Sequence, residues 1–207
     1  CEGDSTILTA SGGSDFSWNT GETTASITVS PTVTTTYTVS GLDQMGNPAT
    51  DSVTVFVNPN PTAEAGSNVA ICAGDSTVLT ASGGDTYAWS NGEITQSITV
   101  SPTSTTTYTV TVTQNGCTDS DTVLVLVNQP PNADAGPDVT INNGDNTTLT
   151  ATGGGTYLWS TGETTASITV SPTVTTTYSV IVTSAVGCDA TDDVVVTVNS
   201  TNTVIAN

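Results

Sequence analysis

The 207-residue chain contains no lysine, arginine or histidine, and its 19 Asp and Glu residues give it a formal charge of −19 at pH 7. With no side chain that could neutralise a phosphate, a nucleic-acid partner is excluded, and an anionic membrane surface would repel the chain. No apolar run is long enough to span a bilayer, so we expect no membrane insertion. The carboxylates either lie in water or bind a cation, and a solvated surface is the simpler interpretation.

The same absences argue against catalysis. Acid–base and nucleophilic mechanisms usually employ histidine or lysine, and the serines and threonines here have no histidine to activate them. A carboxylate pair could act on a glycoside, with Asp119 and Asp121 or Asp192 and Asp193 as nominal pairs, but neighbouring acids near turns are usually solvated. We therefore expect a protein that is not an enzyme and that uses no organic cofactor.

What the chain does have is repetition. The stretch TGETTASITVSPTVTTTY occurs at 20–37 and again, unchanged, at 161–178, and residues 91–108 differ from it at only four positions. Stretches rich in proline and asparagine at 58–66 and 128–136 are typical of short, semi-rigid joints. The chain is therefore predicted to consist of repeat 1 (1–58), repeat 2 (59–128), repeat 3 (129–199) and a tail (200–207).

Each repeat is predicted to fold as strands. Polar and apolar residues alternate in Thr- and Val-rich segments bounded by Gly, Pro and Asn, which indicates half-buried strands. In repeat 2 these segments are 67–71, 76–81, 86–90, 96–100, 105–112 and 121–127. Six or seven short strands in about 70 residues favour a small β-sandwich of immunoglobulin type. The predicted fold class is all-β, with three such domains in an elongated array.

Aromatic residues recur at fixed places in the repeats. The set comprises Trp18, Trp89 and Trp159 with Tyr37, Tyr108 and Tyr178. Each tryptophan has Phe16, Tyr87 or Tyr157 two residues before it, and alternate residues of a strand share one face. We interpret the six recurring residues as core, although exposed tryptophans could instead stack on sugars.

The sequence resembles a known group of surface proteins. The segments AEAGSNVAICAGDSTVLTASGG, YAWSNGE, SITVSPTSTTTYTVTV and NGC resemble the Ig-like and PKD-like repeats of Bacteroidota cell-surface adhesins and gliding-associated secreted proteins. The resemblance covers nearly the whole chain and implies an extracellular or cell-surface location and a non-catalytic structural or adhesive role. It also implies O-glycosylation where Asp-Ser or Asp-Thr precedes an apolar residue or threonine, at Ser5, Ser52, Ser76 and Thr122.

The four cysteines allow two pairings. Cys1 and Cys72 share one repeat position, and Cys117 and Cys188 share another. A bond within one repeat could form only as Cys72–Cys117. If the repeats stack end to end, the two positions of neighbouring repeats meet, which gives Cys1–Cys117 and Cys72–Cys188. We favour this second pairing, the first stays open, and both require an oxidising compartment.

The two ends of the chain differ from its middle. Repeats 2 and 3 are preceded by strand-like segments at 67–71 and 137–141, whereas repeat 1 begins at Cys1 without one. A domain that is short of one strand exposes a sheet edge and an apolar slot, which a strand of another copy could fill. We expect Thr203, Val204 and Ile205 to be this donor strand, in a head-to-tail homopolymer. The alternative is a fragment of a longer array whose first strand was cut off.

A further expectation concerns calcium. Glu64, Asp134 and Asp138 lie in the links between repeats, where carboxylates from two domains could hold Ca²⁺ and stiffen the joint.

The predicted function is a rigid stalk or a self-assembling, pilus-like filament at a bacterial surface. The alternative is an adhesin module that binds glycans or proteins on another surface.

Overall fold

The computed structural model of the chain describes residues 1–199, and all the regular secondary structure in that range is β-strand. The chain forms two compact units. The first comprises Cys1–Ser67, Val78–Thr99 and Thr107–Leu124, and the second comprises Asn68–Thr77, Val100–Thr106 and, among the described residues, 125–199. Every sheet takes its strands from a single repeat. The predicted donor strand, Thr203, Val204 and Ile205, lies outside the described residues.

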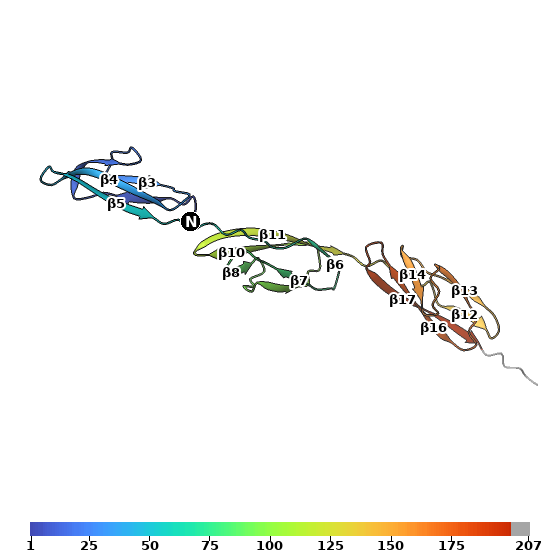
Figure 1. Cartoon of the computed structure of the whole chain (residues 1–207). Helices are drawn as coiled ribbons and strands as arrows, with labels where there is room; N and C mark the ends of the chain where they lie inside the picture. Colours follow the sequence, from blue (N-terminus) through green and yellow to red (C-terminus); the bar gives the residue numbers. More distant parts are fainter. Residues whose placement is uncertain (200–207) are drawn as a thin grey trace, which may run out of the picture. The chain divides into compact units, whose positions relative to one another are not determined.

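Repeat 1 has five strands in two sheets. They are β1 (Thr6–Thr9), β2 (Gly13–Trp18), β3 (Ser26–Val29), β4 (Thr35–Asp43) and β5 (Pro48–Val55). One sheet pairs β1 with β3, and the other has the order β2-β4-β5, with β4 and β5 running side by side in Figure 1. Because side chains alternate across a strand, each strand contributes every second residue to the core. That core contains Leu8, Trp18, Ile27, Val29 and Tyr37.

Repeat 2 has six strands. They are β6 (Val69–Cys72), β7 (Thr77–Thr80), β8 (Thr86–Trp89), β9 (Ser97–Val100), β10 (Thr106–Gln114) and β11 (Cys117–Asn128). One sheet has the order β6-β11-β10-β8 and the other pairs β7 with β9. The first strand, β6, runs parallel to the end of β11, from Val69 opposite Val125 to Cys72 opposite Asn128.

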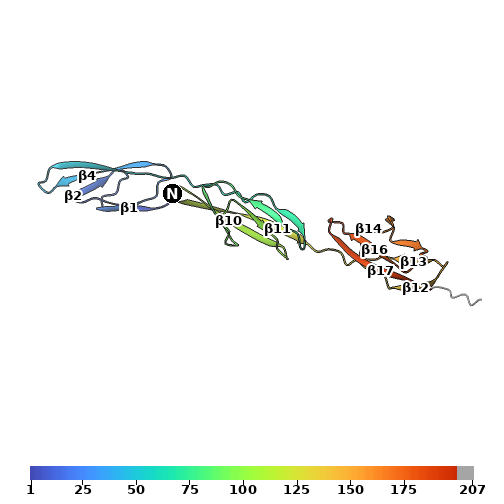
Figure 2. The ribbon, with the colours of Figure 1, turned by 90° about the horizontal axis from the view of Figure 1, so that it is seen from below.

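Repeat 3 has the same topology as repeat 2. Its strands are β12 (Val139–Asn142), β13 (Thr147–Thr150), β14 (Thr156–Trp159), β15 (Ser167–Val170), β16 (Thr176–Thr183) and β17 (Asp189–Asn199). The sheets have the orders β12-β17-β16-β14 and β13-β15, and Figure 2 shows β12 beside the end of β17. Its core includes Ala135, Trp159, Ile168, Val180 and Val194.

The repeated eighteen-residue stretch contains the turn whose backbone accepts a hydrogen bond from each tryptophan. The indole Nε1–H of Trp18, Trp89 and Trp159 donates to the carbonyl oxygen of Thr24, Thr95 and Thr165 respectively, each at 3.0 Å. All three indoles are buried, and a buried N–H needs such an acceptor. The repetition therefore preserves a core anchor together with its hydrogen-bond partner. Tyr37 and Tyr178 are also buried, whereas Tyr108 is only half-buried.

The fold agrees with the predicted tandem immunoglobulin-like β-sandwiches, and the strand limits differ from the prediction mainly at β11. The prediction begins this strand at residue 121, but it begins at Cys117. The cause is a tight hairpin in which Asn115 and Gly116 both have positive φ, of 50° and 82°. Two such residues suit a turn that continues the twist of both strands, so β10 and β11 pair almost up to the turn. Cys117 is consequently a strand residue and not a loop residue.

Candidate functional site

Two disulfides join neighbouring repeats. Cys1 is bonded to Cys117 in the first unit, and Cys72 is bonded to Cys188 in the second. This is the pairing that end-to-end stacking predicts, and the alternative bond Cys72–Cys117 does not form. Each bond connects the segment that precedes β1 or β7 in one repeat to the β-hairpin of the next, so each covalently closes a junction.

Backbone hydrogen bonds fix the start of each linker to the repeat that the linker leaves. The carbonyl oxygen of Asn58 accepts the N–H of Glu2 at 3.0 Å, and that of Asn128 accepts the N–H of Ala73 at 2.9 Å. At the first junction the side-chain amide of Asn58 also donates to the carbonyl of Asn115 at 3.0 Å. The segment that leaves one repeat is therefore fixed to that repeat and, through Asn115, to the next.

Beyond its start, the first linker forms an isolated antiparallel β-bridge with repeat 2, at Glu64 and Ser82. Two aspartates of β11 accept its backbone N–H groups, Asp119 Oδ2 from Ala63 and Asp121 Oδ2 from Ala65, both at 2.8 Å. Between them, Glu64 exchanges two backbone hydrogen bonds of 3.1 and 2.9 Å with Ser82. The side chains of Ala63 and Ala65 are 7% and 1% exposed, so they face the core.

Repeat 3 holds the second linker in the same way. Asp192 Oδ2 accepts the N–H of Ala135 at 2.8 Å, and Asp134 exchanges backbone hydrogen bonds of 3.2 and 2.8 Å with Thr152. Ala190 stands where repeat 2 has Asp119, so one of the two carboxylate contacts is absent here. In both repeats the middle residue of an Ala-x-Ala segment pairs through its backbone with a residue just after a strand. The second alanine donates its backbone N–H to an aspartate on another strand.

The hydrogen bonds to Asp121 alter its acidity. Its pKa lies below the usual value for aspartate, first because the Ala65 N–H donates to the carboxylate and second because the Thr122 N–H does. Both donors favour the charged form, and the small loss of hydration at the site acts in the opposite direction. In a chain without cationic side chains, backbone N–H groups serve as the partners of this carboxylate.

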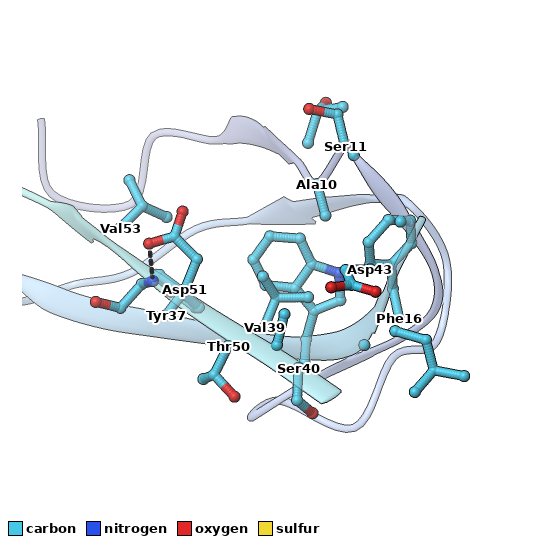
Figure 3. A pocket seen from close by; sticks show the side chains of 18 residues that line it. Ala10, Ser11, Phe16, Tyr37, Val39, Ser40, Asp43, Thr50, Asp51 and Val53 are labelled. Carbon is cyan, nitrogen blue, oxygen red and sulfur yellow. Dashed lines mark hydrogen bonds between the residues drawn. The ribbon is translucent and has the colours of Figure 1, made fainter. Parts of the chain in front are cut away.

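In repeat 1 the corresponding place is an open groove of about 260 Å³. Figure 3 shows it between the end of β1 and the edge of β5, with Ala10 on one side and Asp51 and Val53 on the other. Tyr37 and Val39 of β4 form its floor, and no first strand precedes β1 among residues 1–199. The sheet β2-β4-β5 accordingly has three strands, where repeats 2 and 3 have four.

The exposure of equivalent side chains measures this opening. Val53 is 42% exposed, whereas its counterparts Val123 and Val194 are 1% and 0% exposed. Ala10 is likewise half-exposed, and its counterpart Ala81 is fully buried. Since the strands that carry these residues are otherwise alike, the missing linker segment accounts for the difference.

The predicted ligand sites have different outcomes. The backbones of Glu64 and Asp134 pair with those of Ser82 and Thr152, respectively. The Asp138 carboxylate accepts the N–H of Val195 at 2.8 Å. Among residues 1–199 no group of three or more His, Cys, Asp or Glu side chains is arranged to hold a metal ion. Calcium at the junctions stays a prediction, which unfolding temperatures with and without a chelator test.

The predicted glycosylation acceptors are accessible. Ser5, Ser52, Ser76 and Thr122 are all exposed. Their modification stays a prediction, which the intact mass of the purified protein tests. The tryptophans considered as sugar platforms are buried, so the described residues assign them to the core.

Sequence reasoning did not find the linker anchors. Sequence patterns indicate Asp119, Asp121 and Asp192 only as members of nominal catalytic pairs, and they give the alanines no role. The available signal was the recurrence of Ala-x-Ala five residues after an asparagine in both linkers, at 63–65 and 133–135. Small residues at alternate positions are typical of a strand that lies close between two sheets.

Comparisons with known proteins give structural neighbours only. No protein-family model and no curated protein matches the chain. Among solved structures, the titin I-band fragment I67–I69 is 15% identical, with 95% of this chain and 88% of that chain covered and a TM-score of 0.43. Extracellular domains 3–5 of Drosophila OTK are 12% identical, covering 96% and 92%, with a TM-score of 0.39. The insect immune protein hemolin is 14% identical, covering 96% and 72%, with a TM-score of 0.37.

None of the residues that the structure describes belongs to a helix long and apolar enough to cross a bilayer.

Proposed function

We propose that this chain is a non-catalytic, extracellular structural protein whose immunoglobulin-like repeats assemble head to tail into a filament at a bacterial surface. The observation that carries the proposal is the open groove of repeat 1. Equivalent sites in repeats 2 and 3 are each filled by the segment that leaves the preceding repeat. A site of this kind binds an incoming strand mainly through backbone hydrogen bonds, which is how β-augmentation joins protein chains.

The junctions inside the chain support a structural role. Each is closed by a disulfide, and the linker is held by backbone hydrogen bonds and by a carboxylate of the next repeat. A disulfide persists in an oxidising environment, which agrees with secretion. A head-to-tail contact between copies would repeat the non-covalent part of this junction. The resemblance of the repeats to those of bacterial surface proteins supports the proposed location.

A head-to-tail interface joins the groove of one copy to the tail of the next, and it generates an open filament when the rotation between copies does not close a ring. The Asn199 carbonyl accepts the N–H of Asn143 at 3.2 Å, as Asn58 and Asn128 do with Glu2 and Ala73. Repeat 3 therefore ends with the same backbone arrangement from which a linker starts in repeats 1 and 2.

Light scattering and electron microscopy of the purified 207-residue chain test the proposal. We expect concentration-dependent growth into unbranched fibres, and a variant without residues 200–207 should remain monomeric with an unchanged circular dichroism spectrum. A chain that stays monomeric at all accessible concentrations, or a shortened variant that assembles as well as the full chain, contradicts the donor-strand filament.

A further inference from the structure

The groove in repeat 1 keeps the groups that bind a linker in the other repeats. Asp51 is the counterpart of Asp121. Its Oδ1 accepts the N–H of Ser52 at 2.8 Å, and its Oδ2 has no partner among residues 1–199. Ser11 is the counterpart of Ser82, and within the described part of the chain its backbone N–H and carbonyl are both unpaired. The two sides of the groove thus offer the acceptor and the strand edge that a linker uses.

Repeat 1 also keeps the space that a linker needs. A Cβ added to Gly83 would overlap the carbonyl oxygen of Thr62, and one added to Gly153 would come within 2.7 Å of the carbonyl oxygen of Asn132. The equivalent Gly12 has the same left-handed backbone, with φ of +88°, but a Cβ there meets nothing within 4 Å. Gly12 therefore borders the empty position of an incoming carbonyl group.

The sequence of the tail has the register of a linker. Ala63 is the fifth residue after Asn58, Ala133 is the fifth after Asn128, and Val204 is the fifth after Asn199. By this count Val204 and Ala206 correspond to the inward-facing Ala63 and Ala65. Ile205 corresponds to the outward-facing Glu64, and Thr203 corresponds to Thr62.

Resting on the proposed head-to-tail assembly, we infer that residues 203–206 of a second copy occupy this groove in the register of a linker. Ile205 exchanges both backbone hydrogen bonds with Ser11, and Asp51 Oδ2 accepts the N–H of Ala206. Val204 and Ala206 face the core and cover Val53, while the Ile205 side chain faces outward. The Thr203 carbonyl lies against Gly12, as the Thr62 carbonyl lies against Gly83.

Two matched variants of the full chain test the register. Ala206→Asp and Ile205→Asp each add one negative charge to the tail and leave the described repeats untouched. Because Ala206 is inward-facing in this register, its aspartate would be buried without a partner. We expect the apparent association constant, measured by sedimentation velocity, to fall by more than about tenfold. Ile205→Asp places its charge in water and should leave that constant within about threefold of the wild-type value.

A second pair of variants tests the groove itself. Gly12→Ala should abolish assembly by blocking the Thr203 carbonyl, while circular dichroism shows that the monomer stays folded. Asp51→Ala should weaken assembly by removing the acceptor for Ala206. As a direct probe, a labelled peptide with the sequence of residues 200–207 should bind the monomeric Ala206→Asp chain but not the Gly12→Ala chain.

The outcomes separate this inference from the filament proposal. If the wild-type chain does not assemble, the proposed function itself fails. If it assembles but Ala206→Asp and Ile205→Asp behave alike, or Gly12→Ala assembles normally, the filament stands and the register is wrong. If the wild-type chain is monomeric and does not bind the peptide, and if Gly12→Ala leaves the placement of residues 200–207 unchanged, then no second copy occupies the groove. If the tail enters the groove of its own chain, peptide binding is blocked at every protein concentration, and the second-copy inference is overturned.

Discussion

The carboxylate of Asp121 accepts the backbone N–H of Ala65 at 2.8 Å, and in this way a strand residue of repeat 2 holds the segment that arrives from repeat 1. Asp192 does the same for Ala135 in repeat 3. In repeat 1 the equivalent carboxylate, Asp51, faces the open groove (Figure 3). The contrast between an occupied and an empty version of one site supplies matched controls for most of the predictions below.

The first prediction concerns acid. Because the folded-state pKa of Asp121 is lowered, its stabilising contribution is present above the ordinary aspartate value of about 3.9 and is lost as the pH falls through the lowered pKa. Asp121→Ala should therefore lower the unfolding temperature at pH 7, and the difference from wild type should vanish at acid pH. Asp51→Ala is the control and should change the monomer little. A pH-independent difference would mean that the carboxylate acts only through packing.

The second prediction concerns the disulfides between repeats. Replacing Cys1 and Cys117 together by serine opens a covalent loop that spans a sequence separation of 116 residues. In the chain-entropy treatment this lowers the free energy of unfolding by about 4–5 kcal/mol. Denaturant titration measures the change, and the Cys72 and Cys188 double variant, with the same separation, should behave alike. A negligible loss for both would show that the junctions are held by hydrogen bonds alone.

The third prediction compares one core position in two repeats. Val123→Ala should cost about 2 kcal/mol, because two buried methyl groups are lost. Val53→Ala should cost the monomer less than about 1 kcal/mol, because nearly half of that side chain is exposed. Once copies assemble, Val53→Ala should weaken their association, whereas alanine at the exposed Val33 should not. Equal costs for Val53 and Val123 in the monomer would show that the groove is already filled.

The fourth prediction compares two glycines with similar backbones. Alanine at either Gly83 or Gly12 must adopt a left-handed conformation, which costs about 1–2 kcal/mol. At Gly83 the new Cβ would also overlap the Thr62 carbonyl, so the linker must move and the unfolding temperature of this variant should fall further. Thermal unfolding of both monomers measures the difference. A larger loss for Gly12→Ala than for Gly83→Ala contradicts it.

The fifth prediction concerns salt. Two copies that each carry a formal charge of −19 repel one another, and this repulsion opposes assembly. Raising the ionic strength from 0.01 to 0.15 M shortens the screening length from about 30 to about 8 Å and should accelerate fibre growth. Sodium and calcium chloride at equal ionic strength provide the control. A calcium effect beyond screening would support an ion at the junctions, and slower growth at higher salt would contradict the repulsion.

Much of the fold could be predicted because it depends on local pattern. Alternating Thr- and Val-rich segments with glycine and proline at their ends specify strands and turns wherever they occur. The buried indoles of Trp18, Trp89 and Trp159 follow from the same alternation. The junction bonds Cys1–Cys117 and Cys72–Cys188 were one of two predicted pairings, because spacing alone cannot say which repeats face one another.

The anchoring of the linkers was not predictable in the same way. Asp119 and Asp121 stand on a strand far along the sequence from Ala63 and Ala65, and nothing local links an aspartate to the backbone of an incoming segment. Only the packing of that segment between two sheets brings the carboxylates within 2.8 Å of its N–H groups. The same packing, when the segment is absent, creates the groove in repeat 1.

The sequence by itself determined that this is an all-β chain of three copied units, without cationic groups, with strands whose core faces repeat at a fixed period. Those properties follow from side-chain alternation, turn residues and charge, which act over a few residues. The tertiary structure alone decided which cysteines meet, which carboxylates hold the linkers, and where the equivalent site stays open. These features depend on contacts between segments more than fifty residues apart. Such contacts form, and contribute to the free energy of folding, only once the sheets have packed.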